Sequence, residues 1–277
     1  MDVATLSLPA SAPQRARGTA RLVVRAEDGR TRLARLYQEG SAKLRLPRAR
    51  GASLEAVMIN SAGGMTGGDR FNWTVEAGAG AHAVLTTQAC ERVYRASADV
   101  ARVDTGLTLG PGARLDWLPQ ETILFDGSAL SRRITADLAP DASLLLCEAV
   151  ILGRHAMGET FARGIFHDRW RVRRSGRLVF ADDLRLEGDI PHLIHQSALL
   201  AGAGAFATLL LVAPDADARL DAVRQAIDVL GGDLGGASAF DGKLVARLAA
   251  ADGLALRRAL IPALAALGAA PPAVWTL

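Results

Sequence analysis

Hydrophobic and polar residues alternate near the N-terminus in a pattern typical of a β-hairpin. The alternation runs through residues 19–26 and resumes at residues 31–37. Between the two runs, Asp28-Gly29 is a dipeptide that favours two-residue hairpin turns. We therefore expect two antiparallel strands here. Residues 1–17 show no such pattern and are predicted to form a loose leader.

A repeat follows the hairpin and is the most informative pattern for the fold. Each repeat has a turn rich in Gly, Pro or Asp, then an alanine, then a run of β-forming residues. The alanines are Ala52, Ala81, Ala113 and Ala142, at spacings of 29, 32 and 29 residues. A repeat of about 30 residues must contain more than one strand, because strands are about 5–6 residues long. A fixed period indicates that successive repeats stack on one another. We predict a mainly β fold of helically wound, stacked β-sheets. A plain antiparallel sandwich with regular hairpins is the alternative.

Strand patterns continue through residues 169–173 and 177–186, and helical spacing appears later. A start signal at residues 214–217 precedes an apolar stripe that Gly231-Gly232 ends. The stripe consists of Leu220, Val223, Ile227 and Leu230. A second helix is expected within residues 252–267, where Pro262 should bend it or mark a boundary. Its apolar face consists of Leu256, Leu260 and Leu264.

A strand pattern at residues 242–248 separates the two predicted helices, so the C-terminal part is small and mixed. Because no linker-like segment divides the chain, we predict a single β-rich domain over residues 18–277. The apolar run at residues 196–214 is interrupted by Gly202 and Gly204. It is too short to span a membrane and is interpreted as buried structure.

Composition excludes several classes of function. The chain has 277 residues, of which 22% are charged, and the net charge of +3 is too small to indicate nucleic-acid binding. The arginines at residues 169–174 alternate with apolar residues, as on a solvated strand. Two cysteines, Cys90 and Cys147, provide neither a disulfide framework nor a paired-cysteine zinc motif. The N-terminus lacks a signal-peptide pattern, so we expect a cytoplasmic protein.

The segment from Ile59 to Phe71, INSAGGMTGGDRF, raises the question of phosphate binding. A P-loop that started at Gly63 would need lysine and a hydroxyl residue after Gly68, but Asp69 and Arg70 stand there. An aspartate would repel phosphate, which excludes this site. The segment is interpreted as a tight turn, after which Asp69 and Arg70 point to opposite faces of a strand.

The same segment resembles the glycine-rich signature of the urease accessory protein family called UreD, or UreH. Three further family blocks follow in the same order, at residues 81–95, 115–125 and 152–159. Their matching positions include Thr86, Thr87, Tyr94, Arg95, Pro119, Gln120 and Glu121. A weaker match runs on to the C-terminus. Ser61-Ala62 departs from the family, in which prolines are common at these positions.

The resemblance implies a scaffold that helps to insert nickel into apo-urease and is not an enzyme. Family members act with a helical adaptor of the UreF type and a nickel-carrying GTPase of the UreG type. Their fold is β-rich with helically wound sheets. Nickel is implied to cross the scaffold through a channel, without a tightly bound cofactor in this chain. The leucine-rich faces of the C-terminal helices could offer a surface for the adaptor or pack equally well on the chain's own core.

A route for nickel should offer weak, spaced oxygen or nitrogen ligands, because a tight cage would trap the ion. We therefore select acids in the matched blocks and in the following strand. These candidates for nickel transit are Asp69, Glu121, Glu148, Glu159 and Asp182. A structural or surface role remains the alternative for each.

Two adjacent pairs, Cys90-Glu91 and Cys147-Glu148, combine soft and hard ligands. Neighbours in a strand point to opposite faces, so neither pair should chelate one ion. Buried apolar cysteines are the better interpretation. His192 and His195 have a spacing that suits a metal on a helix, but Pro191 precedes them and the segment lacks a firm helical pattern.

Catalysis has little support, since the Gly-x-Ser-x-Gly motif of a nucleophile elbow is absent. Stacked sheets with acids on one face would also suit a β-helix-like carbohydrate-active enzyme. That class is the alternative to the accessory scaffold.

Overall fold

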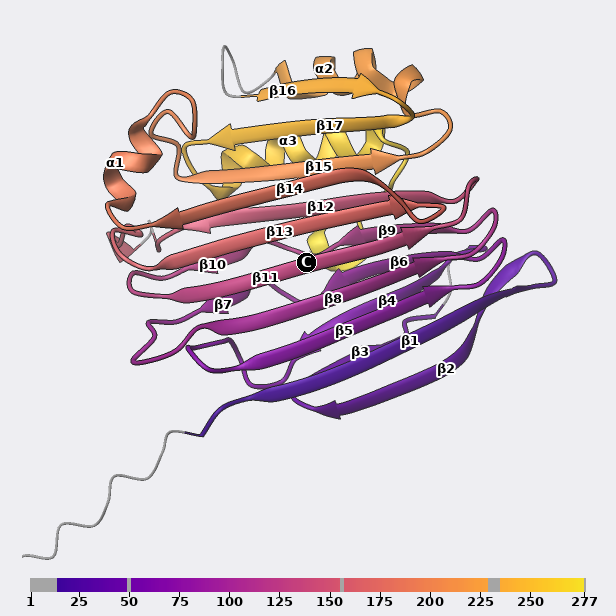
Figure 1. Cartoon of the computed structure of the whole chain (residues 1–277), viewed down its shortest axis with the longest axis horizontal. Coiled ribbons are helices and arrows are strands. Elements are labelled where there is room, and N and C mark those ends of the chain that lie inside the picture. Colours follow the sequence, from indigo (N-terminus) through magenta and orange to yellow (C-terminus); the bar gives the residue numbers. More distant parts are fainter. Residues whose placement is uncertain (1–13, 49–50, 155–156, 229–234, 277) are drawn as a thin grey trace, which may run out of the picture.

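The chain winds as a coil whose successive turns add strands to two facing β-sheets (Figure 1). The computed structural model describes residues 14–48, 51–154, 157–228 and 235–276. Sheet A consists of β1 (Arg17–Glu27), β2 (Arg30–Gly40), β5 (Arg70–Ala77), β8 (Ala101–Leu109), β11 (Ala129–Leu138), β13 (Ile165–Arg174) and β14 (Arg177–Glu187). Its spatial order is β14-β13-β11-β8-β5-β1-β2. The predicted leader lies mostly outside the described residues.

Sheet B faces sheet A and shares its winding. Its strands are β3 (Ala42–Arg45), β4 (Leu54–Asn60), β6 (His82–Thr87), β9 (Arg114–Leu118), β12 (Ser143–Leu152), β15 (Ala205–Val212), β16 (Gly235–Phe240) and β17 (Lys243–Ala250). The spatial order is β16-β17-β15-β12-β9-β6-β4-β3. Two short strands, β7 (Glu91–Val93) and β10 (Thr122–Leu124), run parallel to each other and extend the sheet beside β12.

The central strands of both sheets are parallel, and their register reproduces the sequence repeat. In sheet B, Leu54 lies beside Ala83, His82 beside Arg114, and Arg114 beside Ser143. These partners are 29, 32 and 29 residues apart, the spacings of the alanine repeat. The prediction of wound, stacked sheets is therefore confirmed. The plain antiparallel sandwich is wrong, because antiparallel pairing occurs only towards the two ends of each sheet.

The repeated alanines mark the corners at which the coil enters sheet B. Ala81, Ala113 and Ala142 are buried. The backbone N–H of Arg114 donates to the carbonyl oxygen of Ala81, and that of Ser143 donates to the carbonyl oxygen of Ala113, so successive corners are stacked. Ala52 is exposed, since it precedes the first parallel strand of the sheet. The predicted hairpin is also confirmed: β1 and β2 pair across Asp28 and Gly29, which both have positive φ.

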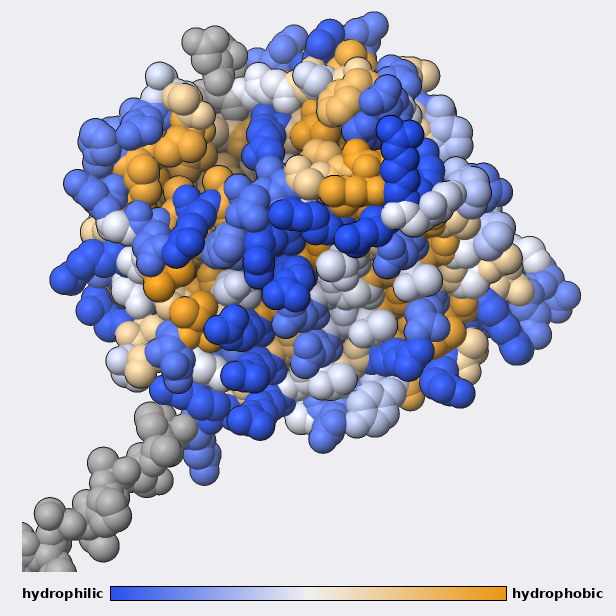
Figure 2. All heavy atoms as spheres, in the orientation of Figure 1, coloured by the Kyte–Doolittle hydropathy of each residue, from blue (hydrophilic) through white to orange (hydrophobic). Residues whose placement is uncertain are grey.

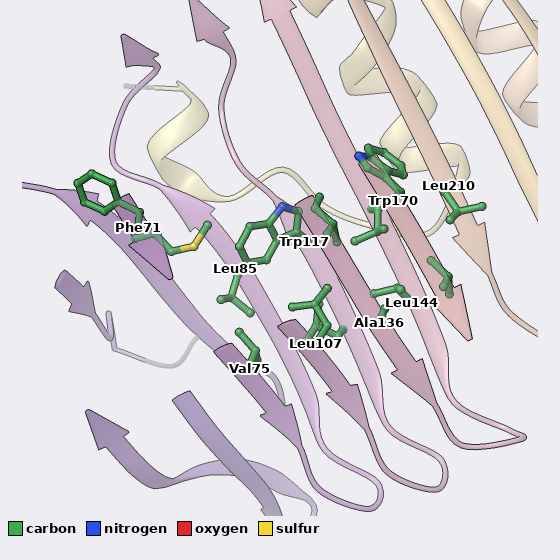
Figure 3. Packing of buried hydrophobic residues seen from close by; sticks show 14 of the residues in the cluster. Phe71, Val75, Leu85, Leu107, Trp117, Ala136, Leu144, Trp170 and Leu210 are labelled. Carbon is green, nitrogen blue, oxygen red and sulfur yellow. The ribbon is translucent and has the colours of Figure 1, made fainter. Parts of the chain in front are cut away.

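Two apolar cores lie on opposite faces of sheet B. The larger core fills the space between the sheets, and Figure 3 shows side chains from both sheets meeting there, among them Leu107, Trp117 and Trp170. The second core lies between sheet B and the helices α2 (Leu220–Ile227) and α3 (Gly253–Ala266). β15 is buried at every position because both of its faces are covered, which explains its uninterrupted apolar sequence.

The predicted C-terminal helices are confirmed, with two corrections. The helix α3 continues past Pro262, so of the two expected effects, a bend or a boundary, the boundary is wrong; burial on sheet B offsets the missing hydrogen bond. Its leucine face, Leu256, Leu260 and Leu264, is fully buried in the chain's own core, so it is not free to dock an adaptor. The predicted helix stop at Gly231-Gly232 lies outside the described residues. Single turns of 3₁₀ helix occur at Asp217–Arg219 and Ala273–Thr276.

A further helix, α1 (Ile190–His195), forms where no helical pattern was recognised. Pro191 stands in its first turn, where proline is tolerated because the first N–H groups have no partner within the helix. The Asp189 side chain accepts a hydrogen bond from the N–H of His192 and caps the helix. The interpretation of Pro191 as evidence against a helix was therefore wrong.

The outer face of sheet A carries many charged side chains, with apolar patches between them (Figure 2). On β13, Trp170 and Val172 point inward, while the arginines that alternate with them, at residues 169, 171 and 173, are partly exposed, as predicted. Within the described part of the chain, no helix has the length and apolarity needed to cross a membrane.

The glycine-rich segment forms the loop between β4 and β5 and packs tightly against a neighbouring turn of the coil. A Cβ atom on Gly64 would lie 2.4 Å from the Tyr94 ring. One on Gly67 would lie 2.1 Å from the carbonyl oxygen of Ala98. Close approach of the chain therefore requires glycine at both positions.

Substitution of Gly67 by alanine should destabilise the protein by roughly 2 kcal/mol or more, because the clash is with backbone that no rotamer change relieves. Gly106→Ala is the matched control, since its added Cβ meets nothing within 4 Å. It should change stability by less than about 1 kcal/mol, in the stabilising direction. Urea denaturation of both variants measures the difference. Equal destabilisation would contradict the assigned role of the loop.

Candidate functional site

A cavity of about 270 Å³ lies between the two sheets, and the glycine-rich loop forms part of its wall. Its lining combines apolar side chains with a small set of polar groups contributed by both sheets. The polar lining residues include Asn60, Glu91, Thr105, Arg132 and Glu148. At about 30 Å³ per molecule, the volume suits several waters or one hydrated ion.

A buried cluster of charges joins the sheets at this cavity. Arg132 on β11 and Asp168 on β13 are register partners in sheet A, and Glu148 projects from β12 of sheet B. Arg132 donates to both carboxylate oxygens of Asp168, from Nε at 3.1 Å and from Nη2 at 2.6 Å. Its Nη1 pairs with Glu148 Oε2. All three residues are buried, so solvent screens this cluster little.

The carboxylate of Glu148 is held on both oxygens. Trp117 Nε1 donates to Oε1 at 2.9 Å, while Arg132 holds Oε2. Burial raises the pKa of Glu148 to about 7, against the opposing effects of Arg132 and the Trp117 hydrogen bond. Glu148 is therefore a buried, ionisable oxygen ligand in the wall of the cavity.

A second carboxyl, Glu91 of β7, lines the same cavity. Asn60 Nδ2 donates to Glu91 Oε1 at 3.2 Å and also to the carbonyl oxygen of Gly64, which ties the glycine loop to this acid. Burial raises the pKa of Glu91 to about 7, while the Asn60 hydrogen bond acts against the shift.

The cavity contains an unsatisfied hydroxyl as well. Among the described residues, Thr105 Oγ1 is one of a few buried polar side-chain atoms without a hydrogen-bond partner. Buried polar groups are almost always paired. The Thr105 hydroxyl is therefore available to a polar guest in the cavity.

Glu121 lies behind the cavity wall. It forms two bonds with Arg257 of α3, to Nε at 2.9 Å and to Nη2 at 2.6 Å. The Cys90 thiol, which lines the cavity, donates to Glu121 Oε2 at 3.3 Å. Burial raises the pKa of Cys90 to about 11, with the charge of Glu121 acting in the same direction, so the group is a thiol at neutral pH.

Asp69 fastens the glycine-rich turn. Its buried carboxylate accepts hydrogen bonds at 2.8 Å from the backbone N–H groups of Ala16 and Thr66, so it ties the start of sheet A to the loop. The neighbouring Arg70 is exposed. The predicted opposite orientation of this pair is confirmed.

The remaining two candidate acids lie away from the cavity. Glu159 pairs with Arg154 and accepts the backbone N–H of Asp126 at 3.0 Å. The hydrogen bond from Arg154 lowers the pKa of Glu159. Asp182 on β14 accepts Arg247 Nη2 of β17 at 2.8 Å and so links the two sheets near their upper ends in Figure 1.

The five candidate acids therefore do not gather at one place. Glu148 lines the cavity and Glu121 lies behind its wall. Asp69 stabilises the glycine-rich turn, Glu159 bonds within a loop, and Asp182 links β14 to β17. In the part of the chain that the structure describes, no group of three or more His, Cys, Asp or Glu side chains is placed to hold a metal ion. Cys147 lies in the second core and Glu148 faces the cavity, which confirms that this adjacent pair cannot chelate together.

Sequence reasoning missed the other two members of the charged cluster, Arg132 and Asp168, although a signal for them was present. Along β11, inward positions are apolar except for Arg132, which stands between Leu130 and Ile134. Along β13, Asp168 interrupts the inward series in the same way. A charged residue at an inward position of a strand must find a buried partner. Alternation alone could therefore have marked both residues.

Chemically, the cavity offers hard oxygen donors beside a resident guanidinium. Carboxylates and a free hydroxyl suit a divalent cation or its hydration shell. The thiol at Cys90 and the apolar part of the lining do not add charge. The arrangement suits weak, reversible binding of a cation better than a closed cage.

Comparison with known proteins places the chain among urease accessory proteins. A family model described as UreD urease accessory protein matches residues 16–276. A urease accessory protein UreD from Rhizobium leguminosarum bv. viciae is 57% identical over 267 residues, covering 96% of this chain and 97% of the relative. One from Rhizobium rhizogenes is 54% identical over 275 residues, covering 99% and 100%. One from Sinorhizobium medicae is 55% identical over 274 residues, covering 97% and 98%.

Glu91→Gln should stabilise the protein increasingly as pH rises. The folded state holds a proton on Glu91 up to about pH 7, whereas the unfolded chain releases it near its ordinary pKa of 4.5. Wild-type stability therefore falls relative to the variant between about pH 4.5 and 7, by roughly 1–3 kcal/mol. Denaturation midpoints from pH 5 to 8 measure this trend.

The control for this series is Glu76→Gln, on the outer side of β5, where the glutamate pairs with Arg21 in solvent. Its stability difference from wild type should show no such rise. Parallel curves for wild type and Glu91→Gln would contradict the burial assigned to Glu91.

Proposed function

Since the chain belongs to the UreD family of urease accessory proteins, we propose that it is a non-enzymatic scaffold that helps to insert nickel into apo-urease. The relatives compared above are named as urease accessory proteins. The cavity between the sheets serves as part of the route along which nickel passes. The cation is cargo in this proposal, and no tightly bound cofactor is assigned to the chain.

The single observation that supports this route is a cavity between the sheets that is lined by two carboxyl groups from sheet B. Nickel accepts oxygen and nitrogen ligands, and the cavity offers oxygen ligands from the buried Glu148 and the partly buried Glu91. The glycine-rich loop forms part of the wall, which gives the most distinctive segment of the sequence a place in the proposed function.

The contacts favour Glu148 as the principal transit acid among the five candidates. Glu121 is the next, because Cys90 connects it with the cavity. Asp69, Glu159 and Asp182 do not line the cavity, and a structural role accounts for their contacts.

The proposed partners are apo-urease, a helical adaptor of the UreF type and a nickel-carrying GTPase of the UreG type. Nucleotide binding belongs to the GTPase, in keeping with a glycine loop that lacks the P-loop lysine. We propose a cytoplasmic site of action, without nucleic-acid or membrane partners. The comparisons lend no support to a carbohydrate-active enzyme, and that alternative is not carried further.

The test measures urease activity per urease molecule, with nickel supplied, in cells that carry the urease subunits and the other accessory proteins. Activity should appear only when this chain is present. Equal activity with and without the chain would overturn the proposal.

Glu148→Gln should lower this activation by about tenfold or more, because even indirect partners of metal ligands contribute about 10–100-fold. The substitution keeps the shape of the side chain and removes a ligand charge. Glu76→Gln, on the outer face, should activate urease as the wild type does. A normal level of activation by a folded Glu148→Gln chain would remove Glu148 from the route.

A further inference from the structure

The cavity contains a cation of its own, the guanidinium of Arg132. We propose that Arg132 keeps the cavity a low-affinity site for divalent cations by holding the Glu148 carboxylate in a buried ion pair. Nickel is then passed on instead of being retained. This inference rests on the proposed function and concerns how the same site is regulated.

The carboxylate of Glu148 is already fully bonded within the protein. Both of its oxygens are engaged, Oε2 by Arg132 and Oε1 by the Trp117 N–H at 2.9 Å. A metal ion that binds Glu148 must therefore displace a charged partner or share the carboxylate with it. A ligand that is already paired inside the protein binds an incoming cation more weakly than a free one does.

The guanidinium of Arg132 places a fixed positive charge at the cavity. Arg132 itself lines the cavity, and its side chain is only 7% exposed. A divalent cation beside Glu148 would lie close to this positive charge, where little solvent screens their repulsion. Repulsion of this kind raises the rate at which the ion leaves.

Asp168 prevents Arg132 from moving away from Glu148. Two guanidinium nitrogens bond to Asp168, and the third is left to face Glu148. The guanidinium also lies 5.7 Å from the centre of the Phe166 ring. Asp168 is thus a positioning residue, since it acts on the cation only through Arg132.

The decisive variant combines Arg132→Met with Asp168→Asn. It removes one positive and one negative charge, so the net charge of the cluster is unchanged while Glu148 loses its guanidinium. Nickel binding to the purified full chain, measured by equilibrium dialysis with nickel chloride, should become tighter by about tenfold or more. Urease activation by the same variant should fall, because the ion is retained.

Asp168→Asn alone is the matched control. It keeps the pair between Arg132 and Glu148 and removes a carboxylate charge, so nickel should bind no more tightly than to the wild type. Tightening in the double variant but not in this control supports the inference. An unchanged or weaker affinity of a folded double variant overturns it.

Arg132→Lys covers the case in which the double variant does not fold, as circular dichroism would show. An ammonium group is a compact point charge that lacks the planar fork of a guanidinium and cannot hold both carboxylates in the same way. Nickel affinity should rise in this variant too, by a smaller factor. An affinity equal to or below that of the wild type overturns the inference.

The two readouts separate failure of this inference from failure of the proposed function. If urease activation requires the chain but no Arg132 variant binds nickel more tightly, the proposed scaffold function is supported and the proposed role of Arg132 is rejected. If the wild-type chain has no effect on urease activation, the proposed function falls, whatever the binding data show.

Discussion

The parallel register of the coil is the constraint on which the rest of the structure depends. Each turn must return a strand to hydrogen-bonding distance of the strand below it, and it does so after about 30 residues in sheet B. That register stacks the corner alanines and brings inward-facing residues of neighbouring turns together. Arg132 and Asp168 are 36 residues apart and become direct neighbours only because β11 and β13 pair in this register. The charged cluster is therefore a product of the winding.

A buried cluster of charges has an energetic cost that the apolar core around it must offset. Taking a guanidinium and two carboxylates out of water costs several kcal/mol per ion, and their attraction recovers this only with good geometry. Here the fork of Arg132 bonds to Asp168 with two nitrogens and to Glu148 with a third. The cluster also joins the two sheets across the larger core. A buried cluster of this kind is weak evidence for stability, which is consistent with the role in cation handling proposed above.

Sheet B is a shared wall between the cavity and the helical layer. Glu121 connects the two sides, since it contacts the cavity-lining Cys90 and the Arg257 side chain of α3. Arg257 also packs over the ring of Trp275, whose indole N–H donates to Thr86 of β6. The helices are thereby attached to the wall through charged and aromatic contacts as well as through the apolar core. The leucine face of α3 is buried in this attachment, so a partner protein would have to bind another surface.

Local patterns in the sequence were sufficient for the elements and for the winding. Asp28-Gly29 predicted the first hairpin, the apolar stripes predicted α2 and α3, and the spacing of the alanines predicted the offsets between parallel strands. These features depend on a few neighbouring residues or on a repeated length. Conformational preference and periodicity carry such information directly. The family could also be recognised from ordered blocks of residues, because such blocks are compared position by position.

The tertiary structure decided which side chains meet. The family blocks did not show that Glu148 faces the cavity while Glu159 pairs on the surface with Arg154. Pro262 within α3 and Pro191 at the start of α1 were judged by propensity, which packing and end effects override. The arginine beside Glu148 lies 16 positions away in the chain and on the opposite sheet. Contacts of this kind depend on how two sheets face each other, and that relation is set by burial of the whole core, which no short stretch of sequence contains.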